Sequence, residues 1–155
     1  MSANNSFKPS PLRGLGPAEP HRAGRLNSGV RPLMQIAGEP THSFFGTRLS
    51  EWLLRIPNEL HVDAVGLWQV IPTLTHEFGL SGSGLEDAVR AAVRGLLTAG
   101  ALPVQGSRDP DRWNFRTDLI APGETGVDRV IEYWYSLGRE PSVGDIWFAL
   151  PSQVA

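Results

Sequence analysis

The chain has 155 residues, enough for one compact domain with a sizeable buried core. Its hydrophobic fraction of 41% and charged fraction of 19% are ordinary for a globular protein. The absence of cysteine excludes disulfides and thiolate metal sites. The opening MSANNSFKPSPLRG lacks the apolar stretch of a secretory signal peptide, and no apolar run approaches the ~18 residues that span a bilayer. We expect a cytoplasmic protein that makes no membrane contact.

The net charge of −2 is divided unevenly along the chain. Residues 1–42 carry five basic and two acidic side chains, whereas residues 43–155 carry nine arginines and fourteen carboxylates. The first segment also holds six of the thirteen prolines and shows no period until VRPLMQIAG at 30–38, whose apolar side chains could dock onto the body. This composition predicts an irregular basic arm over 1–42 and a single acidic domain over 43–155.

The first part of the domain is expected to be helical. SFFGTRLSEWLLRI at 43–56 repeats its apolar residues on one helical face and stops at Pro57. ELHV at 59–62 alternates polar and apolar residues, which predicts a short strand. A second helix is expected over 63–78, with a kink or a split at Pro72, because proline removes a backbone donor and clashes with the preceding turn.

The third helix is expected over 85–99, with its capping residues just before it. Ser83 and Glu86 have the spacing of a capping box, in which each side chain accepts from a backbone N–H at the helix start. Gly100 is placed for a left-handed residue that ends the helix, with Leu102 as the apolar contact after it.

The remainder of the chain predicts a hairpin, a helix and a strand. ALPVQ at 101–105 and RWNFR at 112–116 alternate around the turn-rich GSRDPD at 106–111, which favours a β-hairpin. A helix over 127–137 is expected to end at Gly138, and GDIWFALP at 144–151 is expected to form a short final strand. The fold class is therefore α+β, mostly α.

The order helix, strand, helix, helix, strand, wing, strand over 43–117 resembles the winged helix-turn-helix superfamily. The resemblance is carried by GLSGSGLEDAVRAAVRGLLTAGALPVQG at 79–106 and by the returning RWNFR. Pro72 and the linking Ser-Gly-Ser-Gly depart from the pattern. The combination of GLW, GALPV and GDIWFALP also looks like small bacterial proteins encoded beside polymorphic toxins.

The winged-helix resemblance implies that the third helix would face a DNA major groove. Candidate DNA-binding residues are Arg90 and Arg94 on this helix and Arg112 and Arg116 on the hairpin. Glu86 at the start of the same helix would repel phosphate, and with Arg90 it has the spacing of an ordinary surface ion pair. A transcriptional regulator therefore stands as the alternative hypothesis.

Signatures of enzymes and metal sites are incomplete in this sequence. GLSGSG has serine where a nucleophile elbow needs its second glycine, and it lacks the third glycine of a dinucleotide loop. His76-Glu77 begins like a zinc-protease helix, but the second histidine is absent. We therefore expect no catalytic residue, no metal and no cofactor.

A protein-binding module is the leading hypothesis. Its most concrete form is an immunity protein that neutralises a basic bacterial toxin, since an acidic body would speed association with a cationic partner. The candidate partner-binding residues combine acidic and aromatic side chains: Asp109, Asp111, Trp113, Glu132, Tyr133 and Tyr135. Two alternatives stay open, namely that the aspartates only form a turn and that the last helix only closes the core.

Overall fold

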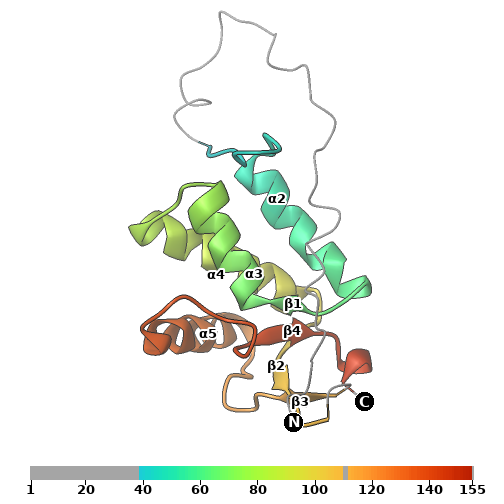
Figure 1. Ribbon diagram of the computed structural model, residues 1–155. Helices are drawn as coiled ribbons and strands as arrows, with labels where there is room; N and C mark the ends of the chain where they lie inside the picture. The colour runs from blue at the N-terminus through green and yellow to red at the C-terminus, as the bar shows by residue number, and fades with distance from the viewer. Residues whose placement is uncertain (1–38, 110–111, 155) are drawn as a thin grey trace, which may run out of the picture.

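The computed structural model describes residues 39–109 and 112–154 and is an α+β structure with mostly helical secondary structure, as predicted (Figure 1). The helices are α2 (Leu49–Arg55), α3 (Leu67–Pro72), α4 (Gly82–Thr98) and α5 (Gly123–Leu137). The strands are β1 (Val65–Gly66), β2 (Leu102–Gly106), β3 (Trp113–Phe115) and β4 (Trp147–Ala149). The arm, except for residues 39–42, and the candidate residue Asp111 lie outside the described residues.

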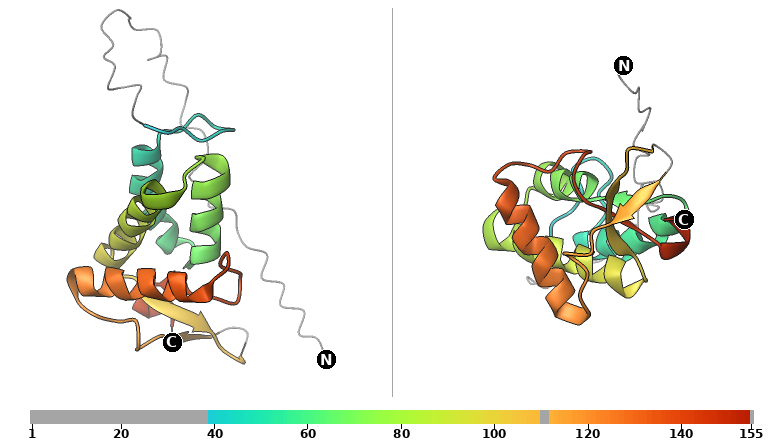
Figure 2. Two further views of the ribbon diagram at one scale, coloured as in Figure 1. Left: turned by 90° about the vertical axis from the view of Figure 1, so that its left-hand side faces the viewer. Right: turned by 90° about the horizontal axis from the view of Figure 1, so that it is seen from below.

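The strands form one antiparallel sheet in the order β1-β4-β2-β3. The predicted hairpin is present as β2 and β3, and the predicted final strand is present as β4. After α5 the chain returns to place β4 between β1 and β2. The larger helices lie on one side of this sheet, as the left view of Figure 2 shows.

The predicted start of the first helix is wrong, because the chain turns back on itself over 41–48. Thr41 bridges to Arg48, and Gly46 adopts a positive φ of 71°. The His42 ring holds this turn from inside, since its Nδ1 accepts from the N–H of Phe44 (3.1 Å) and of Phe45 (3.2 Å). The helix therefore begins only at residue 49.

The predicted strand at 59–62 is also wrong. Residues 59–61 belong to the 3-10 helix η3 (Ile56–His61), which has Pro57 in its first turn, and Val62 follows its end. The first strand comes later, at Val65 and Gly66, because these two residues pair with Phe148 and Trp147 of β4. The backbone N–H and C=O groups of Val65 and Gly66 thus form hydrogen bonds in the sheet and do not extend α3 towards the N-terminus.

The second helix begins at Leu67 instead of 63 and changes its hydrogen bonding at Pro72, where a discontinuity was predicted. Beyond that residue the chain continues as the π-helical segment η4 (Thr73–Glu77). Two threonine hydroxyls donate to carbonyls one turn back: Thr73 to Gln69 (2.7 Å) and Thr75 to Ile71 (2.7 Å). They help to satisfy acceptors around the proline, which has no N–H to offer.

The α4 helix ends as predicted but starts differently. Gly100 has a φ of +98°, its N–H donates to Leu97 (3.0 Å), and the N–H of Ala101 donates to Leu96 (3.1 Å), which is a Schellman ending. The predicted capping box is wrong, since the N-cap is Ser81 and no side chain caps the helix. The Glu86 carboxylate is instead bonded to other side chains.

The last helix is longer than predicted at its start and correct at its end. α5 begins at Gly123, because Pro122 is extended and serves as the N-cap residue. It ends at Leu137, where Gly138 takes the expected left-handed conformation with a φ of 64°. The four additional residues bring the carboxylate of Glu124 onto the helix.

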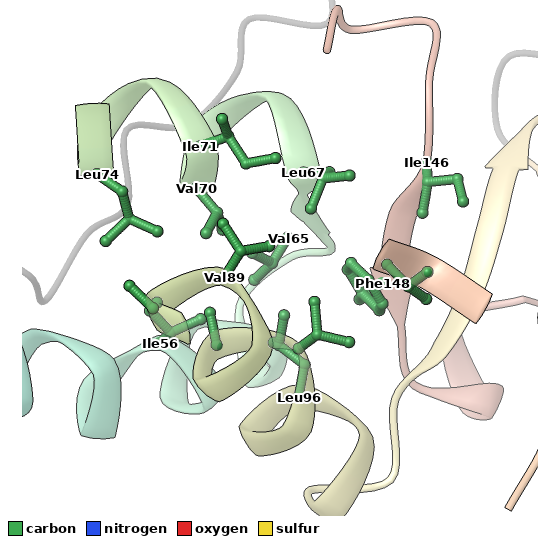
Figure 3. Packing of buried hydrophobic residues seen from close by; sticks show 14 of the residues in the cluster. Ile56, Val65, Leu67, Val70, Ile71, Leu74, Val89, Leu96, Ile146 and Phe148 are labelled. Atoms are coloured by element: carbon green, nitrogen blue, oxygen red, sulfur yellow. The ribbon is translucent and has the colours of Figure 1, made fainter. Parts of the chain in front are cut away.

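Two apolar clusters lie on either side of the sheet. The larger one fills the space between helices and sheet, and Figure 3 shows α3, α4, η3 and β4 contributing Leu67, Val89, Ile56 and Phe148 to it. The smaller one contains Ala64, Val104, Trp147 and Ala149, with Trp68, Trp113 and Val154 packed against it. Trp52 in the larger cluster and Trp147 in the smaller one are both buried.

Candidate protein-binding surface

The most highly charged contact in the described chain joins α4 and α5. On α5, Glu124, Asp128 and Glu132 recur every four residues and therefore line one side of the helix. The helix turns its buried residues, among them Val127, Val130 and Ile131, towards the core. We call the following set the α4–α5 surface: Glu86, Asp87, Arg90, Arg94, Glu124, Asp128, Glu132 and Tyr135.

Side chains cross between the two helices at three levels of this surface. Arg94 donates from two nitrogens to both carboxylate oxygens of Glu124. One turn on, Arg90 donates to Asp128 (2.7 Å) and, on its own helix, to Glu86 (3.0 Å). The phenol of Tyr135 donates to the other oxygen of Glu86. The order of these contacts means that the helices run antiparallel.

These hydrogen bonds hold the surface in its charged state. Donation from Tyr135 and then from Arg90 lowers the pKa of Glu86, and donation from Arg94 lowers the pKa of Glu124. The pKa of Arg90 is raised, first by the bond to Asp128 and then by the bond to Glu86. Each arginine charge is thus offset by adjacent carboxylates. The surface as a whole contains five carboxylates and two arginines.

The four arginines predicted for DNA binding all have a carboxylate partner. Arg90 and Arg94 contact α5, as described above. Arg112 pairs with Asp109 at 3.4 Å, and Arg116 pairs with Asp118 at 2.7 Å. The guanidinium of Arg116 also lies 5.0 Å from the centre of the Tyr133 ring. A phosphate would have to compete with each of these contacts.

The predicted partner-binding residues occupy two separate places. Glu132 and Tyr135 are exposed on the α4–α5 surface, and the Tyr135 ring stacks on Trp134 with 5.0 Å between the ring centres. Asp109 and Trp113 belong to the β2–β3 hairpin, where the Trp113 ring contacts Trp147 at 5.2 Å. The structure therefore does not join them into one site.

Tyr133 has a structural environment that its sequence position did not indicate. It is half-buried, and its hydroxyl donates to Asp145 at 3.2 Å. Burial, and then the neighbouring carboxylate of Asp145, raise the pKa of Tyr133. Asp145 also accepts from Arg139 (2.7 and 3.0 Å) and from the N–H of Ser142 (2.7 Å). These bonds fasten the end of α5 to the chain that enters β4.

The Asp145 carboxylate gives a prediction about acid stability. It is 7% exposed, and the bonds from Arg139 and Ser142 lower its pKa to about 2 from 3.8. A lowered pKa stabilises the fold above the unfolded value, so this contribution of about 2 kcal/mol should fade between pH ~4 and ~2. Asp145→Asn should therefore be less stable than wild type at pH 7, and the difference should shrink near pH 2.5.

Urea unfolding of both proteins at the two pH values measures this difference. The matched control is Asp63→Asn, which changes the same charge at an exposed turn. An Asp145→Asn difference that persists unchanged at the lower pH would show that ionisation of this carboxylate is not what stabilises the fold.

Asp128 and Glu124 were absent from the residues predicted for partner binding. Their four-residue spacing with Glu132 was a usable signal. Asp128 lay within the predicted helix at 127–137, whereas Glu124 lay before its predicted start. No helix in the described part of the chain is long and apolar enough to cross a membrane. The same residues contain no group of three or more acidic or histidine side chains that could hold a metal ion.

Comparisons with models of protein families, with curated proteins and with solved structures found no match to this chain.

Proposed function

We propose that this protein is a non-enzymatic, cytoplasmic protein-binding module that docks a basic partner on its α4–α5 surface. The most concrete form of the proposal is an immunity protein that neutralises a basic bacterial toxin. The observation that carries it is the excess of five carboxylates over two arginines on one surface built from two packed helices. The negative electrostatic potential of such a surface attracts a cationic partner and speeds its association.

The aromatic part of the surface supports a specific contact in addition to steering. Tyr135 is 56% exposed, yet its ring is stacked on Trp134 and its hydroxyl is bonded to Glu86. An exposed aromatic side chain held in one position loses little conformational entropy on binding, and tyrosine is enriched among interface hot spots. Asp87 and Glu132 flank this group as exposed carboxylates that a basic partner can pair with.

The alternative of a winged-helix DNA-binding regulator receives less support. Its four arginines would each have to leave a carboxylate before contacting phosphate. Non-specific DNA affinity depends on net phosphate neutralisation, which paired arginines supply poorly. A gel shift at low salt separates the hypotheses. We expect that the domain does not retard DNA. If the wild-type domain retards DNA and the Arg90→Glu, Arg94→Glu variant does not, the alternative is favoured.

A capture experiment with two matched baits tests the proposal. The first bait is the double variant Asp87→Asn, Glu132→Gln, which removes two surface charges and leaves the arginine pairs intact. The control is Glu39→Gln, Asp63→Asn, which removes two charges elsewhere while each amide oxygen can still accept its backbone N–H. Wild type and control should retain the same basic protein from a host lysate at low salt, and the first bait should lose it.

Mass spectrometry identifies what is retained, and the gene beside the one encoding this chain gives an independent check on the toxin form. Retention of the same partner by both double variants would contradict the α4–α5 surface as its binding site. Retention of an acidic partner would contradict the proposed class of partner.

A further inference from the structure

The turn over residues 41–48 is built around a buried side chain that can change its charge. His42 is 8% exposed, and its ring lies against Phe45, with 4.9 Å between ring centres, and edge-on to Phe78, with 5.4 Å. Its Nδ1 accepts from the N–H groups of Phe44 and Phe45. A ring nitrogen accepts only while it carries no proton, so the neutral ring holds its proton on Nε2. The closed turn therefore requires an unprotonated Nδ1.

Protonation of His42 adds a proton to the same nitrogen that holds the turn. Because Nε2 already carries a proton, the second proton of an imidazolium goes to Nδ1. Nδ1 then becomes a donor that faces two backbone donors, and both hydrogen bonds are lost. Among side chains, histidine is the one that ordinarily changes its charge between pH 5 and 8. A turn that depends on a neutral histidine is therefore sensitive to pH.

The carboxylate of Glu77, at the end of η4, is placed to receive the protonated ring. Its Oε2 lies 3.9 Å from Nδ1 of His42. The same oxygen accepts from the hydroxyl of Ser43, and the Glu77 carbonyl accepts from the Ser43 N–H at 2.8 Å. A carboxylate at this distance favours the charged form of a histidine. The imidazolium thus has an acceptor at hand when it loses the two backbone groups.

Glu77 is the acidic residue that the described chain places within 4 Å of the His42 ring. The other charged side chains on the turn and on the elements beside it interact among themselves: Glu39 with Arg48, Glu51 with Arg55, and His76 with Glu140. The exchange of partners therefore involves one histidine and one carboxylate.

The closed turn also contains a polar group whose needs it does not meet. Thr47 is 4% exposed, and its Oγ1 is buried with no hydrogen-bond partner among the described residues. A buried hydroxyl without a partner costs free energy that contact with water removes. This cost narrows the free-energy difference between the closed turn and an open one.

We propose that the 41–48 turn is a pH-sensitive switch that opens when His42 is protonated. The imidazolium exchanges the N–H groups of Phe44 and Phe45 for the carboxylate of Glu77, and Phe45 leaves its place against the ring. The two phenylalanine rings, which contact each other at 4.8 Å in the closed turn, are thereby released together. The switch uses no residue of the α4–α5 surface, so this inference does not depend on the proposed function.

Amide hydrogen exchange, read residue by residue in NMR spectra of the full chain, tests the switch. His42→Asn is the matched variant, because the asparagine Oδ1 accepts from the same backbone groups and does not titrate. At pH 7.5 the N–H groups of Phe44 and Phe45 should be protected in both proteins. At pH 5 their protection factors should fall about tenfold or more in wild type and stay unchanged in the variant.

Three controls make the result specific. The N–H of Ala101, which donates to Leu96 at the end of α4, should stay protected at both pH values, because only the turn opens. Glu77→Gln keeps an acceptor for Ser43 but removes the charge, so its turn should open only at a lower pH. His76→Gln changes the neighbouring histidine and should open as wild type does.

Unchanged protection of Phe44 and Phe45 in wild type at pH 5 would overturn the proposal. An equal fall in His42→Asn, or loss of the response in His76→Gln, would also overturn it, because another group would then be responsible. A Glu77→Gln protein that opens at the same pH as wild type would contradict the exchange of partners.

Discussion

Gly126→Ala is expected to lower the free energy of unfolding by about 1–3 kcal/mol, the range for overpacking a filled site. A Cβ atom at this position would stand 2.4 Å from the carbonyl oxygen of Ala121 and 3.4 Å from a methyl group of Leu97 on α4. The first neighbour is backbone and cannot rotate away, so the start of α5 has to move. That movement shifts Glu124 away from Arg94 and so disturbs the α4–α5 surface.

Denaturant unfolding at neutral pH measures this change, and Gly84→Ala is the matched control. Gly84 also lies in a helix, with nothing within 4 Å of an added Cβ. Alanine there should leave stability unchanged or raise it by about 0.5–1 kcal/mol, because alanine favours a helix over glycine. Equal stabilities for the two variants would mean that the close approach at Ala121 does not constrain α5.

Gly66→Ala is expected to destabilise the fold by about 1–3 kcal/mol for a different reason. An added Cβ would stand 2.4 Å from the indole nitrogen of Trp68 and 3.2 Å from the Trp147 ring. The added Cβ meets two rings that also contact each other, with 5.8 Å between their centres, and the Gly66 backbone is held by its pairing with Trp147 in the sheet. The substitution therefore displaces the ring of Trp68 or Trp147 or breaks the β1–β4 pairing.

Thermal unfolding followed by tryptophan fluorescence reports both consequences. Gly106→Ala is the control, because Gly106 is also in a strand and has open space where a Cβ would be added. We expect a lowered melting temperature and an altered emission spectrum for Gly66→Ala alone. A melting temperature equal to that of Gly106→Ala would contradict the packing of Trp68 over Gly66.

Local signals in the sequence predicted the parts of the fold that depend on neighbouring residues. Gly100 and Gly138 ended their helices as expected, because a left-handed residue at a helix end is a local requirement that glycine meets best. The β2–β3 hairpin was also predicted, since its two strands and their turn are contiguous in sequence.

Other failures come from distant contacts. Val65 and Gly66 were assigned to a helix, but they pair with β4, which lies about eighty residues further along the chain. No local pattern could indicate this partner. The spacing of Glu86 and Arg90 predicted their ion pair, whereas the bond from Arg90 to Asp128 depends on how α5 lies against α4. Periodicity alone does not supply that placement.

The affinity of the captured basic partner for paired charge variants tests the proposed α4–α5 surface most directly. Calorimetric titration at two salt concentrations compares wild type with the Asp87→Asn, Glu132→Gln protein and with the Glu39→Gln, Asp63→Asn control. We predict that the first variant raises Kd about tenfold at low salt, that the control leaves Kd unchanged, and that added salt narrows the gap. Equal affinities for the three proteins would contradict the account.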